Sequence, residues 1–190
     1  MEVRLGMIYG EKVAIRQMEI GDEDYLYKWW NNEKLMSHAT WICGLLKSKE
    51  SIRKSIINDI ECTELFPETK RYIICKKSDL EPIGEMNYCD YDSRNQKSEL
   101  GIKICELDEQ GKGYGEDALK IFIDFMFKHL NLNKIELTTM KDNTRAQNLY
   151  KKLGFNEIGI IRKAIFDSRN GAFSDVVYMD LLKEEWVNGK

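Results

Sequence analysis

The 190-residue sequence predicts an α+β fold with a mostly antiparallel sheet, and three observations lead to this class. Three extended runs, at 71–76, 83–88 and 97–105, follow one another with only short turns between them. A glycine-rich turn then leads into one long stretch with helical spacing. One more strand, a short helix and a hairpin follow, so only the strands that flank the long helix are expected to run parallel.

The segment before these runs predicts one strand and two helices. Val13 and Ile15 alternate with polar residues, as in a first strand. Gly21-Asp22 is expected to open a helix that continues to Trp30. Ser48 is the expected N-cap of a second helix, whose apolar face carries Ile52, Ile56 and Ile60.

The long helix is predicted to begin at Tyr114 and to cover a sheet. Its apolar residues share one face: Ala118, Leu119, Phe122, Ile123, Phe125, Met126 and Leu130. A strand at 134–140, a short helix that includes Leu149 and Leu153, and a strand at 155–165 follow. Asn170-Gly171 predicts a hairpin turn into a last strand at 173–181.

Composition favours one domain over residues 1–190 and excludes several function classes. Hydrophobic residues make up 43% of the chain, enough for a sizeable core. A net charge of -3 offers no positive field, so we expect no nucleic-acid partner. No stretch approaches the ~18 apolar residues of a membrane helix. The five scattered cysteines are typical of reduced thiols, and we expect a cytoplasmic protein without membrane attachment.

A glycine-rich hexapeptide stands between the third extended run and the long helix. Its residues are Gln110, Gly111, Lys112, Gly113, Tyr114 and Gly115. Glycines let a ligand approach the main chain, and the helix start presents N–H groups and a positive dipole end to an anion. The alternative is a merely flexible turn. No Gly-Lys-Ser/Thr follows, which excludes a P-loop, and the spacing weakens a dinucleotide-binding interpretation, so the pattern favours the pyrophosphate of coenzyme A.

A second block makes the functional prediction specific. Residues 143–155 read Asn-Thr-Arg-Ala-Gln-Asn-Leu-Tyr-Lys-Lys-Leu-Gly-Phe. Together with Gln110, Gly113 and Gly115, this block resembles the two signature motifs of the GNAT superfamily of N-acetyltransferases. The resemblance runs from about Val13 to Leu182 and is strongest to the branch of ribosomal-protein N-terminal and spermidine acetyltransferases. It implies a GNAT-like three-layer fold, with a splayed central parallel pair of strands and flanking helices, and acetyl-CoA as co-substrate.

The resemblance also implies which residues form the site. Tyr150 matches the tyrosine that protonates the leaving thiolate, and Glu99 matches an acidic residue that acts on the amine, directly or through water. The cofactor-binding residues would be Lys103, Ile104 and Cys105 along the pantetheine arm, the hexapeptide Gln110, Gly111, Lys112, Gly113, Tyr114 and Gly115 at the pyrophosphate, and Asn143, Tyr150 and Lys152. Main-chain N–H groups along 103–105 would polarise the thioester carbonyl.

Each of these residues has a structural alternative. Tyr150 also fits the apolar stripe of its helix, where aromatic side chains usually pack. Asn143 is well placed as an N-cap, a role compatible with a cofactor contact. Glu99 could be an exposed strand carboxylate that pairs with a lysine. Glu85 is a weaker candidate for the same base, and Thr138 occupies the position on the next strand where some family members carry theirs.

The remaining reactive residues favour direct transfer without a metal. Cys105 fits a small buried hydrophobe better than a nucleophile. His38 and His129 lack partners at metal spacing, and His129 suits a helix C-terminus. Trp29, Trp30 and Trp41, near Asp22, Glu23 and Asp24, could line a pocket for a cationic amine, although core aromatics beside an acidic helix start are the simpler interpretation.

The sequence therefore predicts an acetyl-CoA-dependent N-acetyltransferase that acts on a primary amine in a ternary complex. A polyamine or a protein N-terminus is the expected acceptor, with an aminoglycoside-type antibiotic as an alternative. The alternative of another class is a sensor that binds acyl-CoA without transferring the acyl group. The resemblance implies a homodimer without fixing the oligomeric state.

Overall fold

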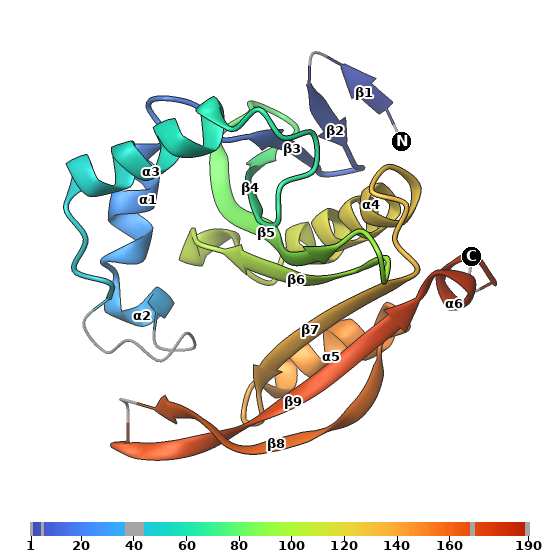
Figure 1. Cartoon of the computed structure of the whole chain (residues 1–190). Helices are drawn as coiled ribbons and strands as arrows, with labels where there is room; N and C mark the ends of the chain where they lie inside the picture. Colours follow the sequence, from blue (N-terminus) through green and yellow to red (C-terminus); the bar gives the residue numbers. More distant parts are fainter. Residues whose placement is uncertain (1, 5, 37–43, 168–169, 189–190) are drawn as a thin grey trace. The chain divides into compact units, whose positions relative to one another are not determined.

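A computed structural model describes residues 2–4, 6–36, 44–167 and 170–188 (Figure 1). The chain divides into two compact units, which are described separately. The first unit comprises Met1–Glu19, Asp59–Glu136 and Leu182–Lys190, and the second comprises Ile20–Asn58 and Leu137–Leu181. The expectation of a single domain over 1–190 stays a prediction.

The first unit is built on a sheet with the strand order β1-β2-β3-β4-β5-β6-β7. Its strands are β1 (Glu2–Arg4), β2 (Met7–Tyr9), β3 (Val13–Gln17), β4 (Lys70–Lys76), β5 (Pro82–Asp92), β6 (Lys97–Ile104) and the start of β7 (Lys134–Met140). Neighbours are antiparallel from β1 to β6, and β6 pairs with β7 in parallel. The predicted fold class and the parallel pairing of the two strands that flank α4 are confirmed.

The parallel ladder between β6 and β7 is short. It joins Lys97, Ser98 and Glu99 to Lys134, Ile135 and Glu136. Strand β6 continues beyond this ladder to Ile104, and β7 continues to Met140. The last five residues of β6 therefore pair with β5 on one side while their other main-chain edge lies beyond the parallel ladder.

Helix α4 (Tyr114–Lys128) contacts β3 and β6, as the long apolar helix was expected to do (Figure 1). Its buried side chains include Phe122, which meets the ring of Tyr72 edge-on at 5.2 Å between centroids. Burying several such side chains stabilises the unit by about 1.5–3 kcal/mol each. His129 is the C-cap residue of this helix, which confirms its predicted place at the helix C-terminus.

The first unit also contains elements that the sequence did not predict. A hairpin of β1 and β2 precedes the strand of Val13, so the predicted first strand is the third. Both strands are three residues long, too short for a periodic pattern to be recognised. Helix α6 (Lys183–Asn188), which follows the last strand, was not predicted either.

The second unit contains α1 (Glu23–Trp30), α2 (Glu33–Met36), most of α3 (Lys49–Glu61), the end of β7, α5 (Thr144–Lys152), β8 (Asn156–Asp167) and β9 (Ala172–Leu182), with the strand order β7-β9-β8. The N-cap prediction is confirmed, because Ser48 Oγ accepts from the N–H of Ser51 at 3.1 Å. Ile52 and Ile56 are fully buried. Ile60 is 49% exposed, so its assignment to the apolar face was wrong, and the short helix α2 was not predicted.

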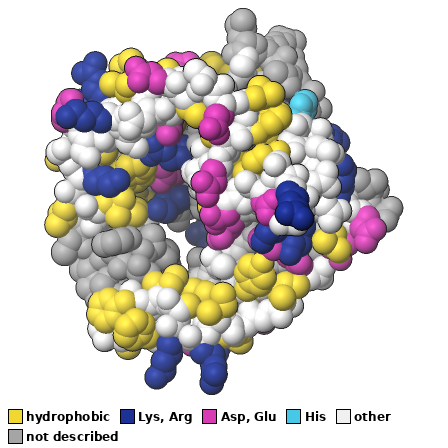
Figure 2. Space-filling view, viewed as in Figure 1, with side chains coloured by type: hydrophobic (Ala, Val, Ile, Leu, Met, Phe, Trp, Pro, Cys, Tyr) yellow, Lys and Arg dark blue, Asp and Glu magenta, His cyan; other side chains and the backbone are white. Residues whose placement is uncertain are grey.

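Charged side chains of both signs are interspersed on the face shown in Figure 2, as the small net charge suggests. Within the described residues, no helix has the length and apolar character that crossing a membrane requires.

One carboxylate joins the start of α4 to the turn between β2 and β3. Asp117 accepts three main-chain hydrogen bonds, from the N–H groups of Glu11, Lys12 and Val13, at 3.1, 2.7 and 3.0 Å. A Cβ atom at Gly10 would lie 2.4 Å from Asp117 Oδ2, so only glycine leaves room for this carboxylate. The Asp117 carboxylate therefore ties the turn to the first turn of α4.

The substitution Asp117→Asn replaces one acceptor oxygen with an amide nitrogen, which donates and cannot accept. We expect a loss of about 1–3 kcal/mol in the free energy of unfolding. The melting temperature should fall by about 2–4 °C for each kcal/mol. Glu116→Gln, in the same turn of α4, is the control, because it weakens a surface pair with Lys120 and should change stability by less than ~0.5 kcal/mol. Equal melting temperatures for both variants would contradict this role of Asp117.

Candidate active site

The glycine-rich hexapeptide forms the predicted turn between β6 and α4. A single turn of 3-10 helix, Leu107–Glu109, leads into Gln110. Gly111 and Gly113 have φ of 81° and 88°, a left-handed conformation that favours glycine, and Gly113 is the N-cap residue of α4. Gly115 differs from them, because its Cβ would meet only Ile104 Cγ1, at 3.6 Å. Packing within the first unit does not require glycine at 115.

Polar groups surround this turn. Lys12 Nζ donates to the carbonyl oxygen of Lys112 at 2.9 Å, which brings a cation to the glycines from a residue 100 positions away. Lys112 forms an ion pair with Glu109 at 2.8 Å. Gln110 Nε2 donates to the carbonyl of Ile104 at 2.9 Å and so fixes the turn to the end of β6. The motif located Lys112 and Gln110, but no local pattern could have located Lys12.

The direction of the main-chain groups along β6 follows from one hydrogen bond. The N–H of Cys105 donates to the carbonyl of Ile83 at 2.8 Å. In an antiparallel pair, alternate residues direct their N–H and C=O groups to the partner. Lys103, which lies opposite Glu85, belongs to the same set as Cys105. Ile102 and Ile104 therefore direct their main-chain groups to the edge where the parallel ladder has ended.

This geometry corrects one expectation for the thioester. The N–H of Cys105 is engaged with Ile83 and is not available to polarise a carbonyl. The N–H of Lys103 points toward β5 by the same alternation. Of the three residues predicted along the arm, only Ile104 directs its N–H to the open edge, and its carbonyl already accepts from Gln110 Nε2. The N–H of Ile102 faces the same edge.

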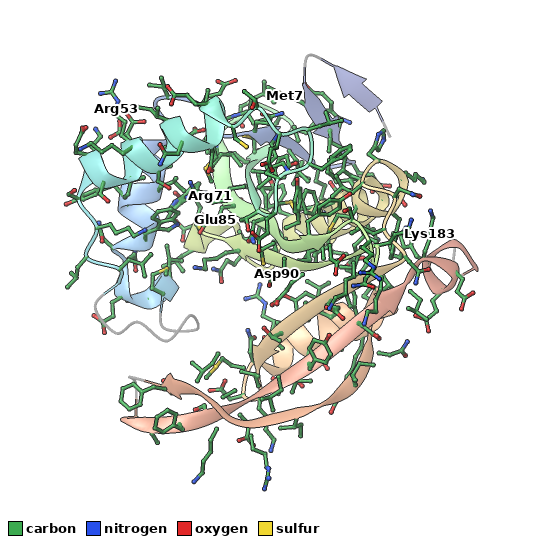
Figure 3. The ribbon with its side chains drawn as sticks, viewed as in Figure 1. Met7, Arg53, Arg71, Glu85, Asp90 and Lys183 are labelled. Carbon is green, nitrogen blue, oxygen red and sulfur yellow. The ribbon has the colours of Figure 1, made fainter. Side chains whose placement is uncertain are left out.

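The two candidate bases lie on one face of the sheet. Side chains of alternate residues share a face, and Glu99 lies opposite Cys89 while Glu85 lies opposite Lys103. This face is opposite to α4, because Ile104 contacts the helix at Gly115. The two carboxylates are separated by four residues along the ladder, about 13 Å. Figure 3 labels Glu85, with Arg71 on the neighbouring strand β4.

Glu99 also belongs to a small group of potential metal ligands. Among the described residues, Cys89, Asp90 and Glu99 place one ligand atom each within 4.8 Å of one another. Burial, with contributions from Glu99 and Asp90, raises the pKa of the Cys89 thiol to about 11. A protonated thiol is a poor metal ligand. The expectation that the protein needs no metal stays a prediction.

Tyr150 and Asn143 belong to helix α5 of the second unit. Tyr150 is 8% exposed and meets the ring of Phe155 edge-on at 5.8 Å. Burial raises the pKa of its phenol to about 12, so the hydroxyl stays protonated at neutral pH. Asn143 is the N-cap residue, since its side-chain oxygen accepts from the N–H of Ala146 at 3.3 Å. Lys152, at the end of the helix, is exposed.

The predicted site residues are therefore divided between the units. The hexapeptide, residues 103–105 and Glu99 belong to the first unit, and they lie along one continuous strand and turn. Asn143, Tyr150 and Lys152 share one helix of the second unit. The N-cap alternative for Asn143 is confirmed, and the amide nitrogen of its side chain can still donate to a ligand.

The cysteine after β6 is unsuited to covalent catalysis. Cys105 is 2% exposed. Burial raises the pKa of its thiol above the usual range, and the carboxylate of Glu85 adds to this effect. A thiol that remains protonated is a weak nucleophile. Cys105 therefore fits the predicted role of a small buried hydrophobe.

The tryptophans of α1 also fit their structural alternative. Trp29 is fully buried and packs against Tyr25 at 5.6 Å between ring centroids. Trp30 is 7% exposed, and Lys47 Nζ lies 5.1 Å from its ring centroid. Glu23 accepts from the N–H of Gly21 at 2.6 Å. Trp41 and His38 lie outside the described residues.

Comparison with known proteins gives concordant results. A family model described as "Acetyltransferase (GNAT) domain" matches residues 12–156. The chain is 29% identical to an uncharacterized N-acetyltransferase, p20, of Bacillus licheniformis, over 95% of this chain and 98% of that protein. It is 31% identical to a putative ribosomal N-acetyltransferase of Bacillus subtilis over 56% of this chain and 57% of that protein. The crystal structure of spermidine N-acetyltransferase from Vibrio cholerae with CoA and spermine superposes with a TM-score of 0.82, at 25% identity, over 93% of this chain and 98% of that one.

Proposed function

The chain belongs to the GNAT acetyltransferase family, and we propose that it transfers the acetyl group of acetyl-CoA to a primary amine by direct attack in a ternary complex. The observation that carries this proposal is the continuous run from the open edge of β6 to the glycine-rich start of α4. The CoA bound to the spermidine N-acetyltransferase of Vibrio cholerae supports the choice of cofactor.

The glycine-rich turn would hold the diphosphate. The first N–H groups of α4 have no partner within the helix, and its positive dipole end favours an anion. Lys12 and Lys112 add positive charge beside the glycines. The missing Cβ of Gly115, which no protein contact demands, leaves space for a ligand to approach the main chain.

The pantetheine arm would pair with β6 as an added strand. An arm that starts at the turn passes Ile104 and Ile102, whose N–H groups lie beyond the parallel ladder. These two positions are about 7 Å apart. The N–H of Ile102 would then lie nearest to the thioester carbonyl and stabilise the negative charge that develops there. The N–H of Leu100 is not available, because the parallel bridge between Glu99 and Glu136 uses it. Glu99 has its side chain on the face opposite to α4.

The chemical step requires an amine that has lost its proton. Glu99 would accept this proton directly or through water, because an amine with a pKa near 10 is mostly charged at neutral pH. The amine nitrogen then attacks the carbonyl carbon, and the new C–N bond forms as the C–S bond breaks. Tyr150 would donate its phenolic proton to the departing thiolate. The side-chain amide of Asn143 would donate a hydrogen bond to the pantetheine arm. The nitrogen loses a second proton as the amide forms, and this proton restores the phenol through solvent, while Glu99 releases the first proton to solvent.

The acceptor class is supported by the relatives. Spermidine and spermine are the amines named for the Vibrio cholerae enzyme, and the Bacillus subtilis relative is named a putative ribosomal N-acetyltransferase. We favour a polyamine, with a protein N-terminus second. The carboxylates of Glu85, Asp90 and Glu99, which come from two adjacent strands, support a cationic acceptor. The sensor and the aminoglycoside-type enzyme remain the alternatives.

Acceptor identity is tested by measuring thiol release from acetyl-CoA with spermidine, spermine, N-terminal ribosomal peptides and kanamycin. We expect the highest kcat/KM with a polyamine, and mass spectrometry should find one added acetyl group. If activity is highest with a peptide or with kanamycin, the proposed acceptor is wrong and the proposed acetyl transfer still holds. Binding of acetyl-CoA without turnover on any of these amines would favour the sensor.

The Gly115→Ala variant tests the diphosphate site. Its added methyl group meets no tight protein contact, so the fold should be as stable as that of the parent. The methyl group should instead displace the diphosphate from the main chain and raise the KM for acetyl-CoA by about 10–100-fold, the loss expected for one charge-assisted hydrogen bond. Gly159→Ala on β8 is the control, because a Cβ atom there meets nothing within 4 Å and the residue lies outside the glycine-rich turn. An unchanged KM in Gly115→Ala would contradict the site.

The Tyr150→Phe variant tests the proposed acid. It keeps the ring packed against Phe155 and removes only the hydroxyl. We expect kcat to fall by roughly 10²–10⁴ while the affinity for acetyl-CoA changes little. Because the phenol pKa is about 12, the parent enzyme should not lose activity through Tyr150 as pH rises to 10. Tyr27→Phe, at an exposed tyrosine of α1, is the control, and an equal kcat in Tyr150→Phe would assign Tyr150 to packing alone.

A further inference from the structure

Strands β5 and β6 of the first unit share a half-buried face, opposite to the face that packs under α4. Side chains at the alternate positions, such as Met86, Tyr88 and Leu100, are buried. We call the half-buried surface the acceptor face, because the candidate bases lie on it. Its residues on the two strands are Glu85, Asn87, Cys89, Glu99, Gly101 and Lys103.

A glycine stands in the middle of β6 on this face. Glycine within a strand is less stable than alanine by roughly 0.5–1 kcal/mol, so its presence needs a reason. The φ of Gly101 lies outside the left-handed region, so the backbone conformation does not require glycine. A Cβ atom there would instead collide with Oδ1 of Asn87, the residue directly opposite on β5. The missing side chain makes room for the Asn87 amide.

The Asn87 amide has a defined orientation. Its oxygen is the atom nearest to the missing Cβ of Gly101, whereas Cγ and Nδ2 would lie 3.3 and 3.5 Å away. The Asn87 side chain also forms a hydrogen bond with the side chain of Cys89. That bond favours the thiolate, so Asn87 is its donor and uses the amide nitrogen. The acceptor oxygen of Asn87 therefore lies over β6, on the acceptor face.

Strand register places this oxygen beside the proposed position of the thioester. The N–H of Ile102 is the donor nearest to the thioester carbonyl in the proposed pairing, and Gly101 directly precedes it. Neighbouring residues of a strand are about 3.4 Å apart, so Glu99 lies about 10 Å from Ile102 along β6. By register, Asn87 Oδ1 is closer to the reacting carbonyl than the Glu99 carboxylate is.

The cations nearby have carboxylate neighbours. Arg71, directly opposite Asn87 on β4, forms an ion pair with Asp59 at 2.7 Å. Lys103 lies opposite Glu85 on the acceptor face. Figure 3 labels Arg71 and Glu85 on their neighbouring strands. These carboxylates offset the two positive charges, so a cationic acceptor can approach Asn87.

We propose that Asn87 contacts the acceptor amine and positions it for attack. Its Oδ1 accepts a hydrogen bond from one N–H of the attacking nitrogen and directs the lone pair of that nitrogen to the thioester carbonyl. This inference rests on the proposed acetyl transfer. The other N–H reaches Glu99 through water, because the positions of Gly101 and Glu99 are about 7 Å apart. The product amide keeps one N–H, so Asn87 orients the nitrogen while Glu99 takes the proton.

The Asn87→Ala variant removes the acceptor oxygen. We expect kcat/KM to fall by about 10–100-fold with spermidine and equally with n-butylamine, the loss expected for one hydrogen bond to a group that becomes charged. The KM for acetyl-CoA should not change. Because n-butylamine has only one nitrogen, an equal loss assigns the contact to the attacking nitrogen. A loss confined to spermidine, or no loss with either amine, would overturn the proposal.

The Asn87→Asp variant keeps an acceptor oxygen at the same place and should recover most of the lost kcat/KM. Asn95→Ala, in the exposed turn of the same hairpin, is the control and should behave like the parent. Thermal unfolding of all variants checks the fold. If Asn87→Asp were as slow as Asn87→Ala at equal melting temperature, the acceptor oxygen would have no role.

The Gly101→Ala variant tests the same contact from the other strand. Its methyl group should displace the Asn87 amide and lower kcat/KM as Asn87→Ala does. In the Asn87→Ala background the methyl group meets no amide, so the double variant should be no slower than Asn87→Ala. Losses that multiply in the double variant would show that the two residues act separately, against the proposal.

Binding separates this inference from the proposed acetyl transfer. Spermidine is titrated calorimetrically into the full chain saturated with CoA, a measurement that needs no turnover. Asn87→Ala should bind spermidine about 10–100-fold more weakly than the parent. Equal affinities would overturn the Asn87 contact. A parent protein that releases no thiol with any amine would instead contradict the acetyl transfer, whereas weaker binding by Asn87→Ala would still support the contact.

Discussion

The part of the proposed site that belongs to the first unit depends on one constraint, the alternating direction of side chains and main-chain groups along strand β6. Ile102 and Ile104, whose main chain faces the open edge, carry apolar side chains on the face toward α4. The alternate residues pair with β5, and Glu99 and Lys103 place charged side chains on the opposite face. Packing of the apolar side chains therefore fixes which N–H groups a cofactor would meet. A slip of one residue would bury both charges and turn the donors away.

The proposed anion site at the start of α4 lies beside two acidic residues of the same helix. Glu116 and Asp117 lie in the first turn, where they interact favourably with the helix dipole but would repel a diphosphate. Each has a local partner. Glu116 pairs with Lys120, and Asp117 accepts three N–H groups from the β2–β3 turn. That same turn brings Lys12 to the glycines, so the contact that occupies Asp117 also supplies a cation.

The sequence predicted what short-range patterns determine. The strands β4 to β6, the helix α4 and the glycine turn each have a local signal, and the structure has all of them. The hairpin β1–β2 has none, because three-residue strands are stable only through their neighbours. Lys12 and the direction of the Cys105 N–H depend on partners distant in sequence, so the predicted donor set for the thioester was partly wrong. Whether Glu99 and Tyr150 act in the reaction stays a prediction.

One physical effect, desolvation, argues for direct transfer over an acetylated enzyme. Burial raises the pKa of both the Cys105 thiol and the Tyr150 phenol. For Cys105 this removes the thiolate that a covalent intermediate would need. For Tyr150 it keeps the proton on the group that would serve as acid, although a phenol with a pKa of about 12 is a weak donor to a thiolate in water. A CoA thiolate released into similarly apolar surroundings would itself be more basic, as the Cys105 thiol is. The proton transfer from phenol to thiolate is then better matched than the reference pKa values suggest.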